Sequence, residues 1–324
     1  MNIKHLLESH SISKHAIIFS DIDGTFWDES YRHPFSEEFL KMVFSRYDVV
    51  FASSRTIPEM LAFQRSIGCR APFIAENGGV VVFYADSYSE NLHSENSHSE
   101  KHIDTDTTVE TIEPLQPPRN YAITISGEQL LLVPLGVNAI NVFPFVKFAM
   151  ADAGVYAEHS RQMPTETLAR IGSYDMEDAQ RAQVRQFSVA ISVEKLTTEQ
   201  IQRLVSSLKR FYCRVSSGGK WMIVTREADK GIAVLWYKEW LWQQHRTYRC
   251  EAGIGNEEND APMLNAVDMP FIVRNQSGYA PTLADIPNAY LLQSEGTFGW
   301  GEMITVLDAL PKQSHSHSPH QSSR

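Results

Sequence analysis

The chain has 324 residues, of which 43% are hydrophobic and 21% charged, a balance typical of soluble globular proteins with one large or two ordinary domains. Its formal net charge of −10 argues against non-specific binding to nucleic acid or to an anionic membrane, so we expect neither as a partner. The cysteines Cys69, Cys213 and Cys250 lack metal-type spacing, and their sparse, odd count indicates reduced thiols and a cytoplasmic protein. Residues 1–14 are polar, which argues against a signal peptide.

Apolar strands alternate with helices over the first quarter of the chain. We expect strands at residues 15–20, 48–53, 73–75 and 80–84, and helices at residues 36–46 and 58–67. Strands that are apolar along their whole length and separated by helices are typical of a parallel sheet covered on both faces. The predicted fold class is therefore α/β.

A polar, low-complexity segment follows at residues 86–108, and a second polar segment ends the chain at residues 313–324. We interpret the first as a mobile insertion and the second as a disordered tail. Histidines recur in both segments, but no further ligand residues accompany them in a metal-type pattern. A solvated loop is therefore favoured over a metal site.

The pattern changes at about residue 121. We expect a hairpin from residues 121–126 and 129–133, helices at 141–153, 175–186 and 198–211, and strands at 187–193 and 221–225. Strands with polar alternation, mixed with helices, predict an α+β domain with an open-faced antiparallel sheet. The parallel pattern returns at Asp229, with a helix at 231–242 and a terminal helix at 301–310. One domain thus consists of residues 1–84 and 229–312, and a second domain, residues 85–228, is inserted into it.

Two carboxylates, Asp21 and Asp23, come directly after the first buried strand and are followed by a Gly-Thr turn. A turn at Gly24 reverses the chain and brings both carboxylates to the same side of the strand end. One carboxylate can then attack phosphorus once a cation has neutralised the field, and the second can give a proton to the leaving oxygen. The bland alternative is an Asx-type turn after a strand.

Three further motifs follow strand ends or open a helix. Ser53 and Ser54 end the second strand, where hydroxyl and N–H groups suit phosphate oxygens, although an ordinary helix N-cap is the alternative. Lys230 opens a helix and can stabilise negative charge in a transition state. The loop at residues 255–260 contains Asn256 and Asp260, whose oxygens suit Mg²⁺. Since strand ends of an open parallel sheet share one crevice, we expect all four motifs to meet.

In this order, the motifs resemble those of the haloacid dehalogenase (HAD) superfamily, most of whose members are phosphatases. The long insert between the second and third motifs is similar to a cap domain of the C2B type. A closer likeness, to the mannosyl-3-phosphoglycerate phosphatase family, is carried by residues 53–56, 72–79, 185–188, 218–221, 229–231 and the region of Trp300. The resemblance implies a Rossmann-like parallel-sheet core with an inserted α+β cap, and Mg²⁺ as cofactor.

The resemblance also implies roles for single residues. Asp21 is expected to be the nucleophile that forms an aspartyl-phosphate, and Asp23 the general acid and then the base. Ser53 and Lys230 are expected to hold the phosphoryl oxygens. The implied Mg²⁺ ligands are Asp21, the backbone carbonyl of Asp23, Asn256 and Asp260. The implied substrate-binding residues are Ser54, Glu76, Asn77, Gly78, Arg185 and Lys220, of which the two cations suit a substrate carboxylate.

The expected substrate is a small phosphorylated sugar-glycerate, mannosyl-3-phosphoglycerate first, with glucosyl-3-phosphoglycerate or another sugar phosphate as the alternative. Asn256 stands where the family usually has Asp, so the metal site has one negative charge less. This departure motivates an alternative of a different class, a catalytically weak sugar-phosphate binding protein. Asp21, Asp23 and Lys230 favour the enzyme.

Overall fold

The computed structural model describes residues 11–12, 16–28, 30–86, 120–125, 127–155, 185–218, 221–276 and 278–310. Four predicted features lie outside the described residues: nearly all of the polar insertion, most of the helix expected at 175–186, Lys220 and the C-terminal tail. Within the described ranges, no helix is long and apolar enough to cross a membrane.

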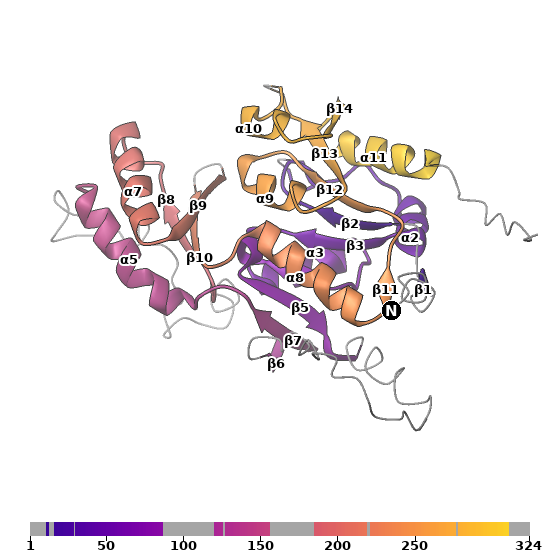
Figure 1. Ribbon diagram of the computed structural model, residues 1–324, viewed down its shortest axis with the longest axis horizontal. Coiled ribbons are helices and arrows are strands. Elements are labelled where there is room, and N and C mark those ends of the chain that lie inside the picture. Colours follow the sequence, from indigo (N-terminus) through magenta and orange to yellow (C-terminus); the bar gives the residue numbers. More distant parts are fainter. Residues whose placement is uncertain are drawn as a thin grey trace, which may run out of the picture.

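A nine-stranded sheet forms the core, in the order β14-β13-β12-β2-β3-β4-β5-β7-β6 (Figure 1). Its strands, in chain order, are β2 (Ile17–Ser20), β3 (Asp48–Ala52), β4 (Phe73–Ala75), β5 (Val80–Tyr84), β6 (Tyr121–Ile125), β7 (Glu128–Pro134), β12 (Glu251–Gly255), β13 (Met269–Arg274) and β14 (Tyr290–Glu295). The strands from β14 to β4 pair in parallel, and β5, β7 and β6 add an antiparallel edge. The predicted α/β class is confirmed.

Helices cover both faces of this sheet. On one face lie α2 (Glu37–Arg46), α3 (Ile57–Ser66) and α11 (Thr297–Ala309), and on the other α8 (Lys230–Gln243), α9 (Ala261–Leu264) and α10 (Pro281–Ala284). Successive residues of β2 alternate between the two cores, since Ile18 packs on the first face and Ile17 and Phe19 on the second. Burial on both faces explains the continuous apolar strands in the sequence. A two-stranded pair of β1 (Ser11–Ile12) and β11 (Arg246–Thr247) lies beside the core.

A second sheet and its helices lie at the left of Figure 1, and we call them the cap. Its antiparallel sheet has the order β8-β10-β9, with β8 (Val189–Ser192), β9 (Cys213–Gly218) and β10 (Trp221–Arg226). Two helices, α5 (Ala139–Asp152) and α7 (Thr198–Arg210), pack on one face of it through a third apolar cluster. Strands packed by helices in this way fit the predicted α+β arrangement with an antiparallel sheet.

The hairpin β6–β7 does not lie where the sequence places it. Residues 85–228 were expected to belong to the inserted domain, but β7 hydrogen-bonds along β5 of the core sheet, with Val81 opposite Val133. The physical reason is that the apolar residues of β7 are buried against the edge of the core sheet. The chain therefore enters the cap after Pro134 rather than at residue 85, while the division into two domains stays a prediction.

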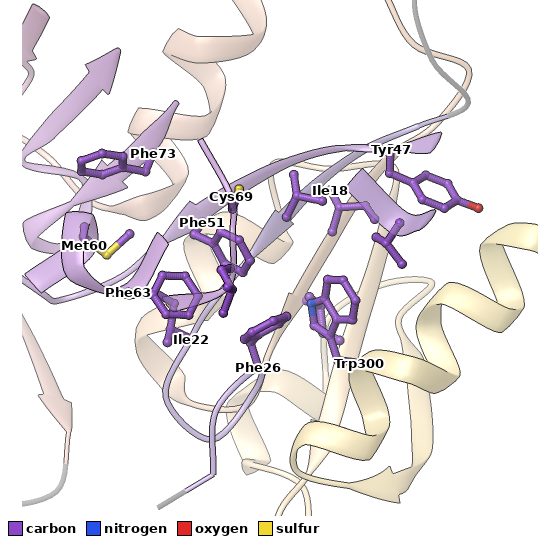
Figure 2. Packing of buried hydrophobic residues seen from close by; sticks show 14 of the residues in the cluster. Ile18, Ile22, Phe26, Tyr47, Phe51, Met60, Phe63, Cys69, Phe73 and Trp300 are labelled. Atoms are coloured by element: carbon purple, nitrogen blue, oxygen red, sulfur yellow. The ribbon is translucent and has the colours of Figure 1, made fainter. Parts of the chain in front are cut away.

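Phe26 ties the turn after β2 to the core. Its ring lies 5.2 Å from that of Phe51, 5.6 Å from Phe63 and 5.1 Å from Trp300, each in an edge-to-face arrangement (Figure 2). Trp300 also donates from Nε1 to Ser20 Oγ at 3.0 Å, and that hydroxyl donates to the carbonyl of Asp21 at 2.7 Å. The end of β2 and the turn that follows are thus held by packing and by hydrogen bonds.

We expect Phe26→Ala to lower the free energy of unfolding by about 3–5 kcal/mol, because it leaves a cavity among fully buried rings. Urea denaturation monitored by circular dichroism measures the change. Phe298→Ala is the matched control, since that ring is 64% exposed and its loss is expected to cost no more than about 0.5 kcal/mol. Equal losses in the two variants would contradict the central place of Phe26.

Candidate functional site

Lys230 lies between two buried carboxylates. It is the first residue of α8, whose N-cap Asp229 accepts a hydrogen bond from the backbone N–H of Ile232 at 2.8 Å. The Lys230 Nζ donates to Asp21 Oδ1 at 2.6 Å and to Asp260 Oδ1 at 2.7 Å. The three residues come from β2, α8 and the loop after β12, so the predicted convergence of strand ends is observed.

Charge is unbalanced in this cluster, because one ammonium faces two carboxylates. Burial and the neighbouring Asp260 raise the pKa of Asp21 to about 8, although Lys230 acts in the opposite direction. Burial lowers the pKa of Lys230, but the two carboxylates raise it by more, so the lysine stays charged. An additional cation beside Asp21 would restore the balance and favour its ionised form.

Asp260 organises the loop that follows β12. Its Oδ2 accepts hydrogen bonds from the backbone N–H groups of Asn256 at 3.0 Å and Glu257 at 3.1 Å, while Oδ1 accepts from Lys230. Both of its oxygens are therefore already hydrogen-bonded within the protein. This arrangement makes Asp260 a residue that positions the lysine and the loop, and its contact to a metal would have to share these oxygens or pass through water.

Asn256 touches the turn after β2. Its Oδ1 accepts a hydrogen bond from Thr25 Oγ1 at 3.0 Å, and a Cβ on Gly24 would lie only 2.3 Å from Asn256 Nδ2. Gly24 also has a φ of 78°, which L side chains rarely adopt, so glycine is required there. The Asn256 amide therefore lies against the turn that follows Asp21.

Oxygen donors at the site are of mixed type. Among the described residues, no group of three or more His, Cys, Asp or Glu side chains could hold a metal ion. The available set comprises the Asp21 carboxylate, a backbone carbonyl and the Asn256 amide, all of which are oxygens of the kind that Mg²⁺ prefers. The donor chemistry and the net negative charge of the lysine cluster fit a divalent cation.

Asp23 is held by Arg55, a contact that the sequence analysis missed. Arg55 Nε donates to Asp23 Oδ2 at 2.9 Å and its Nη2 to Oδ1 at 2.5 Å, which makes the pair bidentate. The guanidinium carbon lies 5.2 Å from the ring centroid of Trp27 and 5.1 Å from that of Tyr31. The available signal was that Arg55 directly follows Ser53 and Ser54 at the same strand end.

The Ser53 hydroxyl of the second motif does not cap helix α3. Thr56 is the N-cap of α3, and it forms a capping box with Glu59. Ser53 is 1% exposed, and its Oγ accepts a hydrogen bond from the backbone N–H of Arg55 at 3.3 Å. The N-cap alternative for this motif therefore falls on Thr56, and Ser53 stays beside the end of β2. Ser54 instead contributes its carbonyl, which accepts from Arg185 at 2.7 Å.

Three consecutive left-handed residues, Glu76, Asn77 and Gly78, join β4 to β5, with φ of 51°, 56° and 89°. Glu76 is fully buried and accepts hydrogen bonds from the backbone of Gln186 at 2.8 Å and Phe187 at 2.9 Å, and from Ser188 Oγ at 2.7 Å. Its pKa is raised by burial, an effect that these hydrogen bonds and Arg185 oppose.

The expected substrate-binding residues therefore differ in what they contact. Glu76 binds the segment at which the described chain enters β8 of the cap, and Gly78 lies against the start of α8, where a Cβ would come within 2.0 Å of the Asp229 carbonyl. Asn77 donates to Ser216 Oγ of the cap at 2.7 Å, and its own Oδ1 is buried with no hydrogen-bond partner among the residues that the structure describes. Arg185 donates to Ser188 Oγ at 3.1 Å. These contacts join the cap to the core around the mouth of the site.

Comparisons with known proteins agree with this geometry. Residues 18–286 match the family described as haloacid dehalogenase-like hydrolases. A glucosyl-3-phosphoglycerate/mannosyl-3-phosphoglycerate phosphatase of Methanococcoides burtonii is 24% identical over 298 residues, covering 90% of this chain and 96% of the relative. A phosphatase of the same name from Persephonella marina is 23% identical over 297 residues, covering 89% of this chain and 95% of the relative.

Solved structures share the fold at low identity. The sucrose-phosphatase of Synechocystis sp. PCC6803, solved with sucrose and phosphate, aligns with a TM-score of 0.52 at 14% identity. The alignment covers 92% of this chain and 100% of the sucrose-phosphatase. A haloacid dehalogenase-like hydrolase of Bacteroides thetaiotaomicron aligns with a TM-score of 0.53 at 13% identity, covering 91% of this chain and 100% of that one.

The two carboxylates that contact Lys230 are expected to respond oppositely to replacement. The pKa of Asp21 in the folded protein, about 8, is above its ordinary value of 3.8. Between these pH values the unfolded chain has released this proton while the folded protein retains it, so the fold loses stability as pH rises. Asp21→Asn removes this cost, so we expect Tm in metal-free buffer to rise by roughly 2–4 °C at pH 8 and to change little at pH 4.

Asp260→Asn is expected to lower the free energy of unfolding by about 3–5 kcal/mol, because an amide cannot accept from the lysine on one side and from two backbone N–H groups on the other. Differential scanning calorimetry in the presence of a chelator measures both variants. If both substitutions destabilise the protein equally at pH 8, the proposed charge imbalance is wrong.

Proposed function

The chain is a phosphatase of the haloacid dehalogenase-like hydrolase family, and we propose that it hydrolyses the phosphomonoester of a phosphorylated sugar-glycerate, with mannosyl-3-phosphoglycerate as the first candidate. The observation that carries the proposal is the buried Lys230, bonded to Asp21 and Asp260 at the end of β2. The substrate class rests on the names of the two curated relatives, which cover nearly the whole chain.

Asp21 is the proposed nucleophile. It is 6% exposed, and Lys230 fixes Oδ1, which leaves Oδ2 for attack on phosphorus. In the first step a bond forms between this carboxylate and phosphorus, the bond from phosphorus to the leaving oxygen breaks, and Asp23 gives its proton to that oxygen. In the second step water attacks the aspartyl-phosphate, Asp23 takes the proton of the water, and inorganic phosphate leaves Asp21.

Lys230 and Ser53 are proposed to bind the phosphoryl oxygens. The ammonium stays charged between its two carboxylates and is already oriented, so it stabilises negative charge without reorganisation when the reaction occurs. Ser53 is buried at the neighbouring strand end, where its hydroxyl can donate to a phosphoryl oxygen.

Mg²⁺ is the proposed cofactor, with the Asp21 carboxylate, the Asp23 carbonyl and Asn256 as direct ligands and Asp260 as a direct or water-mediated one. When bound, the ion supplies positive charge that offsets the repulsion between the substrate phosphate and Asp21. The support for it is the net negative charge of the lysine cluster and the oxygen donors that surround Asp21.

Glucosyl-3-phosphoglycerate is the second candidate substrate. Both curated relatives carry the two sugars in their names, and mannose and glucose differ only in the orientation of one hydroxyl group. Polar groups where the cap meets the core, among them Ser216 of the cap and the buried amide of Asn77 in the core, would have to discriminate the two epimers.

We expect Asp21→Asn to abolish turnover, at least about 10⁴-fold, because an amide is no nucleophile toward a phosphomonoester. Release of inorganic phosphate from mannosyl- and glucosyl-3-phosphoglycerate in the presence of Mg²⁺ measures the effect. Asp285→Asn is the control, since that aspartate is exposed and remote in sequence from all four motifs. Phosphate release by the Asp21 variant at the wild-type rate would exclude the mechanism, and sugar-phosphate binding without release by the wild type would favour a binding protein.

Asn256→Asp restores a negative charge next to the turn after β2, so we expect Mg²⁺ to bind on the order of tenfold more tightly. Titration calorimetry with Mg²⁺ measures the affinity directly, without reference to turnover. Asn265→Asp, at the exposed end of α9, adds the same charge away from the site and is expected to leave the affinity unchanged. Equal affinities in all three proteins would remove Asn256 from the metal site.

A further inference from the structure

We propose that Arg55 recognises the carboxylate of the substrate and, by exchanging Asp23 for it, releases Asp23 for proton transfer. The inference rests on the proposed function, because it requires a substrate that carries a carboxylate near its phosphate. Arg55 would then free Asp23 only when the bound substrate carries a carboxylate.

Asp23 has both carboxylate oxygens engaged in the structure. Oδ1 accepts from Arg55 Nη2 at 2.5 Å and Oδ2 from Arg55 Nε at 2.9 Å. A general acid needs a proton on one oxygen and a free approach from that oxygen to the leaving group. The guanidinium occupies both oxygens of Asp23, so at least one of these two bonds has to break before an Asp23 oxygen can approach the leaving group.

The carboxylate of a 3-phosphoglycerate lies close to this ion pair by its own covalent structure. Only two carbon atoms separate the leaving oxygen from the carboxylate carbon, so with bonds of about 1.5 Å the two groups are no more than roughly 4 Å apart. Asp23 has to reach the leaving oxygen to protonate it, and Arg55 lies within 3 Å of Asp23. The substrate carboxylate therefore comes within reach of the same guanidinium.

The exchange replaces one bidentate carboxylate by another, so Arg55 keeps two charge-assisted hydrogen bonds throughout. Its partner is accessible, since the Asp23 side chain is 44% exposed while that of Arg55 is 18% exposed. A neutral sugar phosphate has no group that can take the place of Asp23 on the guanidinium. Such a substrate would leave Asp23 bound to Arg55 and would react slowly even when its phosphate is held.

The surroundings of Arg55 fix its backbone and leave its head group room to turn. Its backbone N–H donates to Ser53 Oγ at 3.3 Å, and its carbonyl accepts from the N–H of Glu76 at 2.9 Å. The guanidinium rests against Trp27 and Tyr31, and such contacts with ring faces tolerate sliding better than hydrogen bonds do. Trp27 is in turn held by the buried Phe63, 4.6 Å away between ring centroids.

Other cations at the site are less suited to this task. Lys230 is fully buried between two carboxylates, and Arg185 donates to the Ser54 carbonyl and to Ser188 while Glu76 balances its charge. Arg214 pairs with the N-cap Asp229. Arg55 is the one of these four whose partner is the proposed acid itself.

The test compares mannosyl-3-phosphoglycerate with an analogue in which the carboxylate is reduced to a primary alcohol, using wild type, Arg55→Gln and Arg55→Lys in Mg²⁺. We expect the wild type to prefer the carboxylate by at least about tenfold in kcat/KM, the value of a charged hydrogen bond. In Arg55→Gln this preference disappears, because KM for the natural substrate rises while kcat for the neutral analogue increases several-fold.

An increase in kcat for the neutral analogue is the decisive result, since loss of a merely structural arginine would lower it. If Arg55→Gln lowers kcat for both compounds by the same factor, the inference is wrong although the proposed function stands. If the wild type hydrolyses neither compound, both the proposed function and the inference about Arg55 are wrong. Arg55→Lys, which keeps the charge but not the bidentate fork, is expected to show a reduced preference and serves should the glutamine variant fail to fold.

Arg70→Gln is the matched control. Arg70 also pairs with carboxylates, Asp86 and Glu128, and lies over an aromatic ring, that of Tyr84, but at the sheet edge outside the site. We expect this variant to keep the wild-type preference for the carboxylate. A loss of preference in Arg70→Gln equal to that in Arg55→Gln would show that overall charge, rather than the contact with Asp23, sets the selectivity, and would overturn the inference.

Discussion

The buried ammonium of Lys230 is the contact on which the arrangement of the site depends. A charged lysine without exposure to water is tolerated only when carboxylates surround it, and here they come from two different strand ends. The lysine thereby fixes the start of α8, the end of β2 and the loop after β12 relative to one another. When both carboxylates are ionised the cluster carries one surplus negative charge, so a nearby cation would favour the ionised form of Asp21.

Much of the fold follows from the sequence because its strands are apolar along their whole length, which only a sheet covered on both faces explains. The meeting of Asp21, Lys230 and Asp260 follows for the same reason, since strand ends of such a sheet share one edge. The hairpin β6–β7 was misassigned because an apolar strand such as β7 fits either the edge of the core sheet or the cap. Only the long-range pairing with β5 decides between them.

The sequence predicts that the motifs meet at one edge of the sheet, but it does not predict which side chains pair with one another there. The ion pair of Asp23 with Arg55 joins residues that are 32 positions apart, and each belongs to a motif that suggested phosphate or metal contacts by itself. Glu76 was expected to contact substrate because the family resemblance implied that role. Its oxygens instead accept from the cap segment, an arrangement that depends on the left-handed turn and on the path of residues 186–188.

Glu76 has a mechanical consequence for the cap. Its carboxylate accepts hydrogen bonds from the peptide backbone just before β8. The turn that carries Glu76 also packs closely, through Gly78, against the first residues of α8. Separating the cap from the core would leave the buried Glu76 carboxylate without its hydrogen-bond donors, which is costly for a charged group. Strand β9 adds two further attachments, from Ser216 to Asn77 and from Arg214 to Asp229, so the cap is fastened to the core right beside the lysine that holds the site together.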